Sequence, residues 1–129
     1  MISSSFKLTS TASGITSTAA TIGTAIVIRG WQSVVNLEIE NSGSAALTDF
    51  LIELQDHPDG EFYDFLSGTD YATGTDDMLF CTSTVPNTLA ASGKAHVIFR
   101  TWSAYAMRFQ ATCATTTTVK VRGSYSGAR

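Results

Sequence analysis

The chain has 129 residues, a length that fits one domain with a single buried core. Charged residues make up 15%, below the ~25% typical of soluble domains, and 15 Ser and 19 Thr take their place. Since no apolar run approaches the ~20 residues that cross a bilayer, we expect no membrane partner. The first residues lack the layout of a signal peptide, so we expect synthesis in a cytosol.

Charge is distributed unevenly along the chain. Residues 30–93 contain all 11 acidic residues and no Lys or Arg, whereas residues 94–129 contain six basic residues and no acidic one. If antiparallel strands from these two parts pair, each facing pair of unlike charges contributes roughly 0.2–1 kcal/mol. The alternative is that an acidic surface on one subunit binds a basic surface on the next. An isoelectric point near 5.1 argues against a nucleic-acid partner.

The first residues predict an extended N-terminal arm or an edge strand, because Phe6 and Leu8 alternate with polar neighbours. A link rich in Ser, Thr and Ala follows. We therefore divide the chain into an arm and link, residues 1–23, and a single β-sandwich domain, residues 24–129. The run TAIVIR at residues 24–29 opens this domain as a strand that is apolar on both faces.

Two alternating segments joined by an Asn-Ser-Gly turn predict a strand pair. Apolar and polar residues alternate over residues 35–40 and again over residues 49–55. The second segment also matches the helical spacing i, i+3, i+4, i+7, at Leu47, Phe50, Leu51 and Leu54. The strand and turn that precede it favour a strand here.

The last third of the chain repeats the alternation. Residues 94–102, 105–113 and 119–125 each read as a half-buried strand, and short turns join them into a meander. A further short strand is expected at residues 78–82. The sequence predicts an all-β fold, an antiparallel β-sandwich or jelly roll of about eight strands without a helix.

The segment from residue 56 to residue 77 is the most acidic, with seven of the 11 acidic residues. Oxygen ligands on a loop suit calcium. The spacing does not follow the known calcium loop, so a solvated acidic rim is favoured and we expect no bound metal or cofactor. The weak candidates for a metal site are Asp56, Asp59, Glu61 and Asp64.

No stretch carries a motif that defines a reaction. His57 and His96 have no metal-ligand spacing to each other or to the cysteines. Cys81 and Cys113 are expected to be free, buried thiols. We therefore expect no catalytic residue and no enzymatic activity.

Aromatic residues leave a carbohydrate-binding module open as an alternative. Such a module needs exposed rings in one plane, whereas rings of this kind more often pack in a core or a subunit contact. The candidate rings are Trp31, Phe62, Tyr63, Tyr71 and Trp102.

The segments NLEIENSGSAALTDFLIELQDHPDGEFYDFL and AYAMRFQATCATTTTVKVRGSYS resemble small β-sandwich proteins of tailed bacteriophage particles. The shared pattern is a strand, a turn with Asn and Gly, a second strand, and a final hairpin rich in Ala and Thr that ends in V-x-V-R-G. The resemblance implies a non-enzymatic decoration or cement protein of the capsid. Such a protein is made in the host cytoplasm, joins the virion as a homo-oligomer, often a trimer, and binds the major capsid protein or another virion protein.

Residues 1–13 are expected to contact a neighbouring subunit by strand addition. The alternative function is a receptor- or carbohydrate-binding module of a phage tail or a cell surface. The residues expected at subunit contacts are Phe6, Leu8, Tyr63, Tyr71, Arg108 and Arg122.

Overall fold

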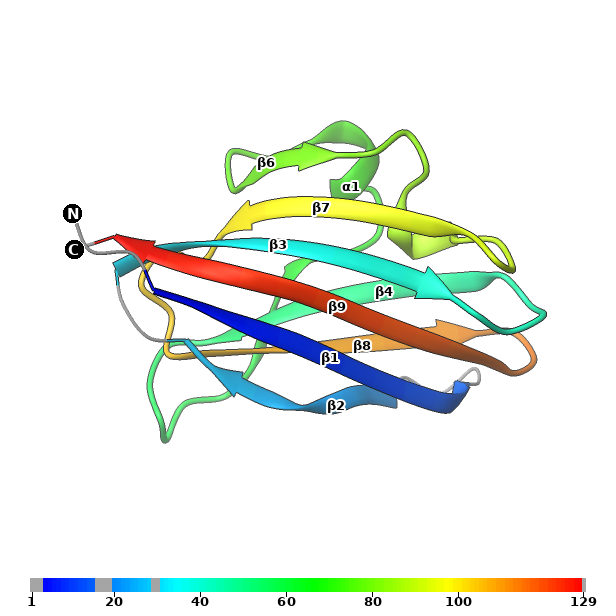
Figure 1. Ribbon diagram of the computed structural model, residues 1–129, viewed down its shortest axis with the longest axis horizontal. Coiled ribbons are helices and arrows are strands. Elements are labelled where there is room, and N and C mark those ends of the chain that lie inside the picture. The colour runs from blue at the N-terminus through cyan, green and yellow to red at the C-terminus, as the bar shows by residue number, and fades with distance from the viewer. Residues whose placement is uncertain (1–3, 16–19, 29–30, 129) are drawn as a thin grey trace.

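The computed structural model describes residues 4–15, 20–28 and 31–128 (Figure 1). Within these ranges the chain forms nine β-strands, one turn of α-helix and one 3-10 turn. The strands are β1 (Ser4–Ile15), β2 (Ala20–Val27), β3 (Trp31–Asn41), β4 (Leu47–Gln55), β5 (Tyr63–Leu66), β6 (Met78–Cys81), β7 (Lys94–Arg100), β8 (Ala106–Cys113) and β9 (Thr117–Ala128). The helical turns are α1 (Asp70–Thr73) and η1 (Pro86–Thr88). Neither described helical turn has the length or apolar character of a membrane span.

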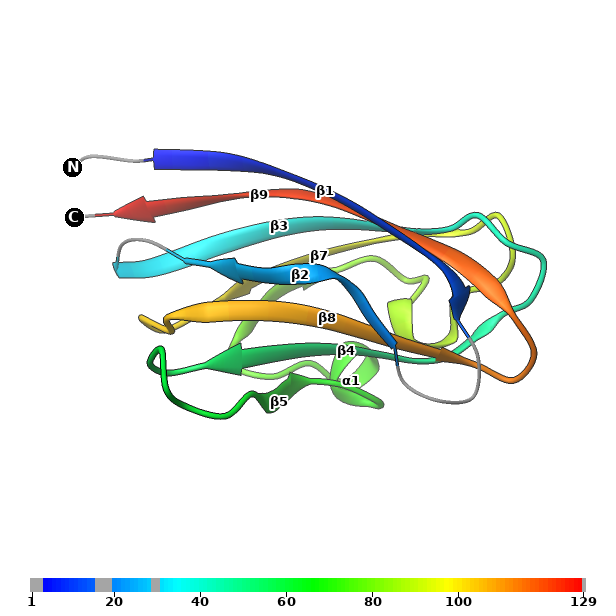
Figure 2. The same cartoon turned by 90° about the horizontal axis from the view of Figure 1, so that it is seen from below.

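The strands form two antiparallel sheets that face each other. One sheet has five strands in the order β1-β9-β3-β7-β6, and the other has four in the order β2-β8-β4-β5. Figure 2 shows them as two layers, with β1, β9 and β3 in one and β8, β4 and β5 in the other. The fold confirms the predicted antiparallel β-sandwich. The expected pairing of β3 with β4 and the expected meander of β7, β8 and β9 are wrong, because β4 and β8 cross to the other sheet and pair there with each other.

The core lies between the layers and is made by the alternating residues of both sheets. In regular strands such as β7 and β8, every second side chain points inward, so one apolar stripe per strand fills the space. The rings of Phe50 and Phe109, from adjacent strands of the four-stranded sheet, lie 6.2 Å apart between centroids. The fully buried side chains include Val35, Ile39, Phe50, Ile52, Val97, Phe99, Met107, Phe109 and Val121. Each large one stabilises the fold by roughly 1.5–3 kcal/mol relative to exposure.

The segment expected to be an arm is the edge strand β1 of the five-stranded sheet. Eleven of its residues pair with β9, from Ser4 opposite Gly127 to Ile15 opposite Thr117. The expected end of the link, residue 23, falls inside β2, because this strand begins at Ala20 rather than at residue 24. Residues 1–3 and 16–19 of the expected arm and link lie outside the described part of the chain.

The structure settles the secondary structure of two segments, residues 47–55 and residues 63–66. Residues 47–55 form the strand β4, so the helical alternative is excluded. The sequence predicts no strand in the acidic segment of residues 56–77, but residues 63–66 form the short edge strand β5, which pairs with β4 from Leu54 opposite Tyr63 to Ile52 opposite Leu66. The extra strand explains why the structure has one more than the eight expected.

The turn between β3 and β4 is held by the buried amide of Asn41. Its Nδ2 donates to the carbonyl oxygens of Ala45 at 2.7 Å and Leu89 at 3.0 Å. Its Oδ1 accepts from the hydroxyl of Thr117 at 2.6 Å and the amide of Gly43 at 3.2 Å. Gly43 is required here, because a Cβ on it would lie 2.0 Å from the Thr117 hydroxyl oxygen.

Candidate functional site

The outer face of the five-stranded sheet is hollowed into an open groove of about 600 Å³, which we call the outer-face groove. It runs across β9, β3, β7 and β6, four neighbouring strands. Pockets of about 300–1,000 Å³ hold ligands of the size of a drug molecule. The side chains that shape it are those of Asn36, Glu38, Phe80, His96, Ile98 and Arg122.

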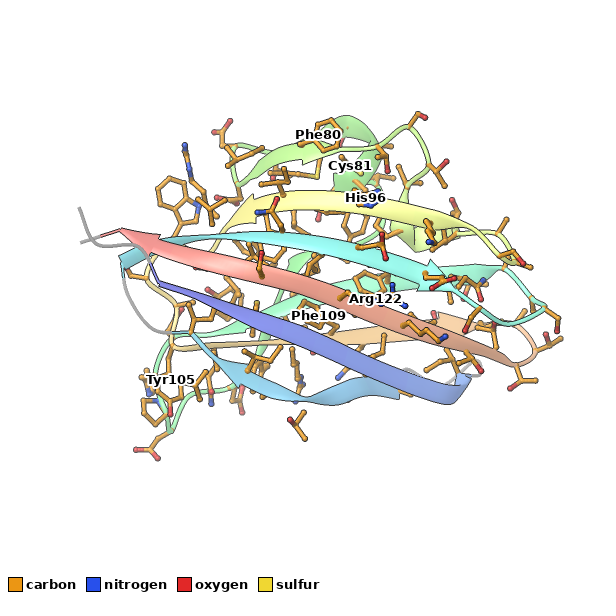
Figure 3. All side chains as sticks on the ribbon, in the orientation of Figure 1. Phe80, Cys81, His96, Tyr105, Phe109 and Arg122 are labelled. Atoms are coloured by element: carbon orange, nitrogen blue, oxygen red, sulfur yellow. The ribbon has the colours of Figure 1, made fainter. Side chains whose placement is uncertain are left out.

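Strand alternation places these side chains on one face. In β3 the buried Val35, Leu37 and Ile39 face the core, so Asn36 and Glu38 face outward. The same alternation applies to β7, where His96 and Ile98 lie between buried residues. Figure 3 shows Phe80 on β6, His96 on β7 and Arg122 on β9, one after another across the sheet.

Glu38 lies at the centre of a charged cluster that crosses three strands. Residue 38 is in register with both His96 on β7 and Arg122 on β9. Its Oε2 is 3.2 Å from Nε2 of His96, and its Oε1 is 3.5 Å from Nη1 of Arg122. Arg122 also reaches Glu40, with 3.9 Å between Nη2 and Oε1. This confirms pairing of unlike charges from the two parts of the chain.

Phe80 closes one side of the groove from the edge strand β6. Its side chain is 51% exposed, and that of its neighbour Leu79 is 46% exposed. Two consecutive residues are exposed because the register of β6 shifts between Met78 and Phe80, which leaves Leu79 as a bulge residue. The next residue, Cys81, is a free thiol whose pKa is raised by burial.

A second charged cluster lies on the outer side of the four-stranded sheet. Arg108 on β8 donates from Nε to Oε1 of Glu53 on β4, at 2.6 Å. Its guanidinium also lies 4.2 Å from the ring centroid of Phe62, a cation–π contact. Asp64 is paired with Glu53 in register, and burial together with the Glu53 charge raises the pKa of the Asp64 carboxyl.

The residues expected at subunit contacts do not share one environment. Tyr71 is 3% exposed, and its hydroxyl donates to the carbonyl oxygens of Phe50 at 2.7 Å and Leu66 at 3.1 Å. It belongs to the core and is not available to a partner, because α1 turns its ring inward. Arg108 and Arg122 are exposed in part and are already paired within the chain.

The remaining expected contact residues lie at strands on the edges of the sheets. Tyr63 on β5 is 43% exposed, and its hydroxyl donates to Oδ1 of Asp56 at 2.9 Å. Burial and this hydrogen bond raise the pKa of Tyr63 to about 12. The backbone of Phe6 and Leu8 pairs with β9, whereas their side chains lie outside the described part. Contact of these residues with a partner stays a prediction.

The acidic segment does not gather into a metal site in the described part of the chain. No group of three or more His, Cys, Asp or Glu side chains is found there in positions that could hold an ion. Of the four weak candidates, Asp56 accepts the Tyr63 hydrogen bond and Asp64 lies beside Glu53. Asp59 and Glu61 are exposed. Both cysteines are free thiols, with Cys113 buried.

Among the aromatic residues suggested for sugar binding, the four whose side chains the structure describes do not form a common platform. Tyr71 is in the core, Phe62 lies under Arg108, and the side chain of Trp31 lies outside the described part. Trp102 is 47% exposed and donates from Nε1 to Asp77. The exposed ring that lines a groove is Phe80, which the sequence alone did not single out.

The fold defines a class, the two-layer antiparallel β-sandwich, and comparisons with known proteins agree with it. No protein-family model and no curated protein matches the sequence. Among solved structures, the chain is similar to the SPBc2 prophage-derived protein YomS, with a TM-score of 0.53 and 13% sequence identity. The match covers 96% of each chain. At this identity the similarity shows a shared fold.

Proposed function

We propose that the protein is a non-enzymatic structural subunit of a bacteriophage particle, a decoration protein that binds the capsid lattice as a homo-oligomer. The fold shared with a prophage-derived protein supports the phage setting. The sequence resemblance to small β-sandwich proteins of phage particles points to the same setting. Its major partner is then the capsid protein or another virion protein.

The observation that carries the assembly role is the open edge of β1. This strand is 12 residues long, and β9 occupies one of its sides. Among the strands that the structure describes, none pairs with its other side. A long edge strand offers a row of backbone N–H and C=O groups to a strand of another chain. Natural monomers usually shorten or block such edges, so a subunit contact is a natural use for this one.

The geometry of strand addition distinguishes a trimer from a dimer. If β1 pairs with β1 of a second copy, the contact is isologous and closes as a dimer. A trimer needs a head-to-tail contact, in which β1 of one copy meets a different surface of the next, such as the edge strand β6 or β5. We favour the trimer, with the β1 edge as one half of each contact.

Proline substitutions in β1 test this role. In an antiparallel edge strand, N–H groups alternate between pointing at the neighbouring strand and pointing outward. Of Thr9→Pro and Ser10→Pro, one therefore removes a backbone hydrogen bond to β9, and the other removes only an N–H group on the open edge. The second of these lowers the melting temperature less, and it is the informative variant because it changes the open edge alone. The first is its control.

We expect the wild-type protein to have three times the 13.7 kDa monomer mass in light scattering. The informative proline variant is expected to be monomeric and to lose binding to purified capsids. A monomeric wild type, or an unchanged oligomer in both folded variants, would contradict assembly through β1.

A receptor-binding module of a phage tail is the second candidate, and the outer-face groove is the observation that favours it. The two roles differ in abundance, because a decoration protein covers the capsid whereas a tail-tip module is present in few copies. Quantification of the protein in purified particles separates them.

A further inference from the structure

We infer that the outer-face groove is a binding site for a neutral oligosaccharide. The groove is separate from the proposed assembly edge, because it extends from β9 to β6 while the open edge lies on the far side of β1. If the other half of the subunit contact is β5, a ligand in the groove and a subunit at the β1 edge can be bound at the same time, because β5 belongs to the other sheet.

The charges of the groove favour a neutral ligand. The carboxylate of Glu38 lies between Nη1 of Arg122 at 3.5 Å and Nε2 of His96 at 3.2 Å, so the positive charge of Arg122 already has an anion beside it. An anionic ligand would approach Glu38 unfavourably, and a cationic one would approach Arg122 unfavourably. A purely apolar ligand would cover this charged cluster without giving it hydrogen bonds, which is costly.

The lining groups match the mixed polarity of a sugar. Each sugar hydroxyl both donates and accepts, and the groove presents carboxylate oxygens, guanidinium N–H groups and the exposed amide of Asn36 side by side. The Arg122 contacts at 3.5 and 3.9 Å are long, so its N–H groups have capacity for further bonds. These groups stand on paired strands, which hold them in fixed positions before a ligand arrives.

Phe80 supplies the apolar surface that a sugar ring requires. The C–H bonds on one face of a pyranose can pack on the electron-rich face of an aromatic ring. Phe80 is 51% exposed at the edge of the groove, and the half-buried Ile98 lies beside it in register. A large exposed ring next to fixed polar groups is the usual composition of a small-molecule site.

An extended peptide fits this groove less well. Peptides bind sheets by adding a strand to an open edge, where backbone groups are free. In the groove, β3 is paired on both sides, with β7 and with β9, so its backbone groups are already used. Recognition there depends on side chains alone.

The test is a titration of the full chain with a panel of neutral trisaccharides of glucose, galactose, mannose and N-acetylglucosamine, followed by calorimetry and by NMR. We expect at least one to bind and to shift the resonances of residues 36, 96 and 122. Sialyllactose, an anionic trisaccharide, is expected to bind more weakly than its neutral counterpart. No binding by any neutral member of the panel would overturn the proposal.

Two variants and one control assign the site. We expect Phe80→Ala and Asn36→Ala to weaken binding by roughly tenfold or more, since each removes one of the two kinds of contact. Leu79→Ala is the control, because Leu79 is similarly exposed on the same strand but does not line the groove. Equal affinity in all three variants, or a loss of oligomer in Phe80→Ala without any saccharide binding, would contradict a sugar site. All three alanine variants alter exposed side chains, so we expect their melting temperatures to match that of the wild type, which verifies that they fold.

Discussion

Arg108 and Glu53 form an ion pair between the adjacent strands β8 and β4, with 2.6 Å between Nε and Oε1. Glu53 is 7% exposed, so its carboxylate depends on this partner for the hydrogen bonds it loses to burial. The same guanidinium covers the ring of Phe62. Arg108 thus has two contacts within its own chain, which gives it a structural role whether or not it also touches a partner.

Removal of one member of this pair is expected to destabilise the protein strongly. Arg108→Ala leaves a nearly buried carboxylate without its cation, and we expect it to lower the free energy of unfolding by about 2–4 kcal/mol. The double variant Glu53→Leu/Arg108→Leu removes both charges and is expected to lose much less. Urea unfolding of the single and double variants measures the difference. An equal loss in both would show that packing, rather than the unpaired charge, is the cause.

Asp64, beside Glu53, is expected to make stability depend on pH. Burial and the Glu53 charge raise the pKa of Asp64 in the folded protein above its ordinary value of 3.8. The folded state then binds more protons than the unfolded chain between these two pKa values, so this group's contribution to stability falls as the pH rises through that window.

Asp64→Asn removes this effect and keeps a donor to Glu53. We expect the variant to be more stable than the wild type at neutral pH and to lose this advantage below the ordinary pKa of 3.8. Urea midpoints at the two pH values give the comparison. If Asp64→Asn stabilised the protein more in acid than at neutral pH, the raised pKa of Asp64 in the folded protein would be contradicted.

Tyr71 tests the assignment of a predicted contact residue to the core. Tyr71→Phe removes only the hydroxyl that donates to Phe50 and Leu66, and we expect a loss of about 1 kcal/mol. Tyr71→Ala also removes the ring and is expected to cost roughly 3–5 kcal/mol. Both losses are read from thermal or urea unfolding. An oligomer that dissociates in the Phe variant without a change in stability would place Tyr71 at a subunit contact instead.

Asn41 is expected to be the most sensitive polar residue of the core. Asn41→Asp keeps the shape of the side chain, but it replaces the amide group that donates to the carbonyl oxygens of Ala45 and Leu89 by a carboxylate oxygen, which can only accept. We expect a loss of about 3 kcal/mol or more at neutral pH, because a buried charge then faces two acceptors. Ser44→Asp, at an exposed position of the same turn, is the control and is expected to have little effect. Similar unfolding midpoints for the two variants would contradict the role assigned to Asn41.

Much of the fold follows from the period-two alternation in the sequence. In β3 and β8 the alternating apolar residues are the ones found in the core, from Val35 to Ile39 and from Met107 to Cys113. The sequence of β4 also matched a helical spacing, and the structure gives the physical reason. The register of β4 shifts between Leu47 and Asp49, so the buried residues on the two sides of this bulge, Leu47 and Phe50, are three positions apart, as on one face of a helix.

The local features that sequence patterns could not reveal are short or irregular. β5 has four residues, and its register shift against β4 breaks the alternation, so it reads as loop. Tyr71 is buried by the single helical turn α1, which is too short to show a period. Phe80 is exposed because of the β6 bulge and the edge position of that strand, which depend on pairing with a distant segment. The outer-face groove, which joins four strands, depends on that same long-range pairing.

The abundance of the protein in purified phage particles is the most direct test of the proposed function. Quantitative mass spectrometry can compare its copy number with that of the major capsid protein in the same particles. The proposed decoration role predicts a copy number of the same order as that of the capsid protein. Absence from the particle, or only a few copies in each, would contradict that role.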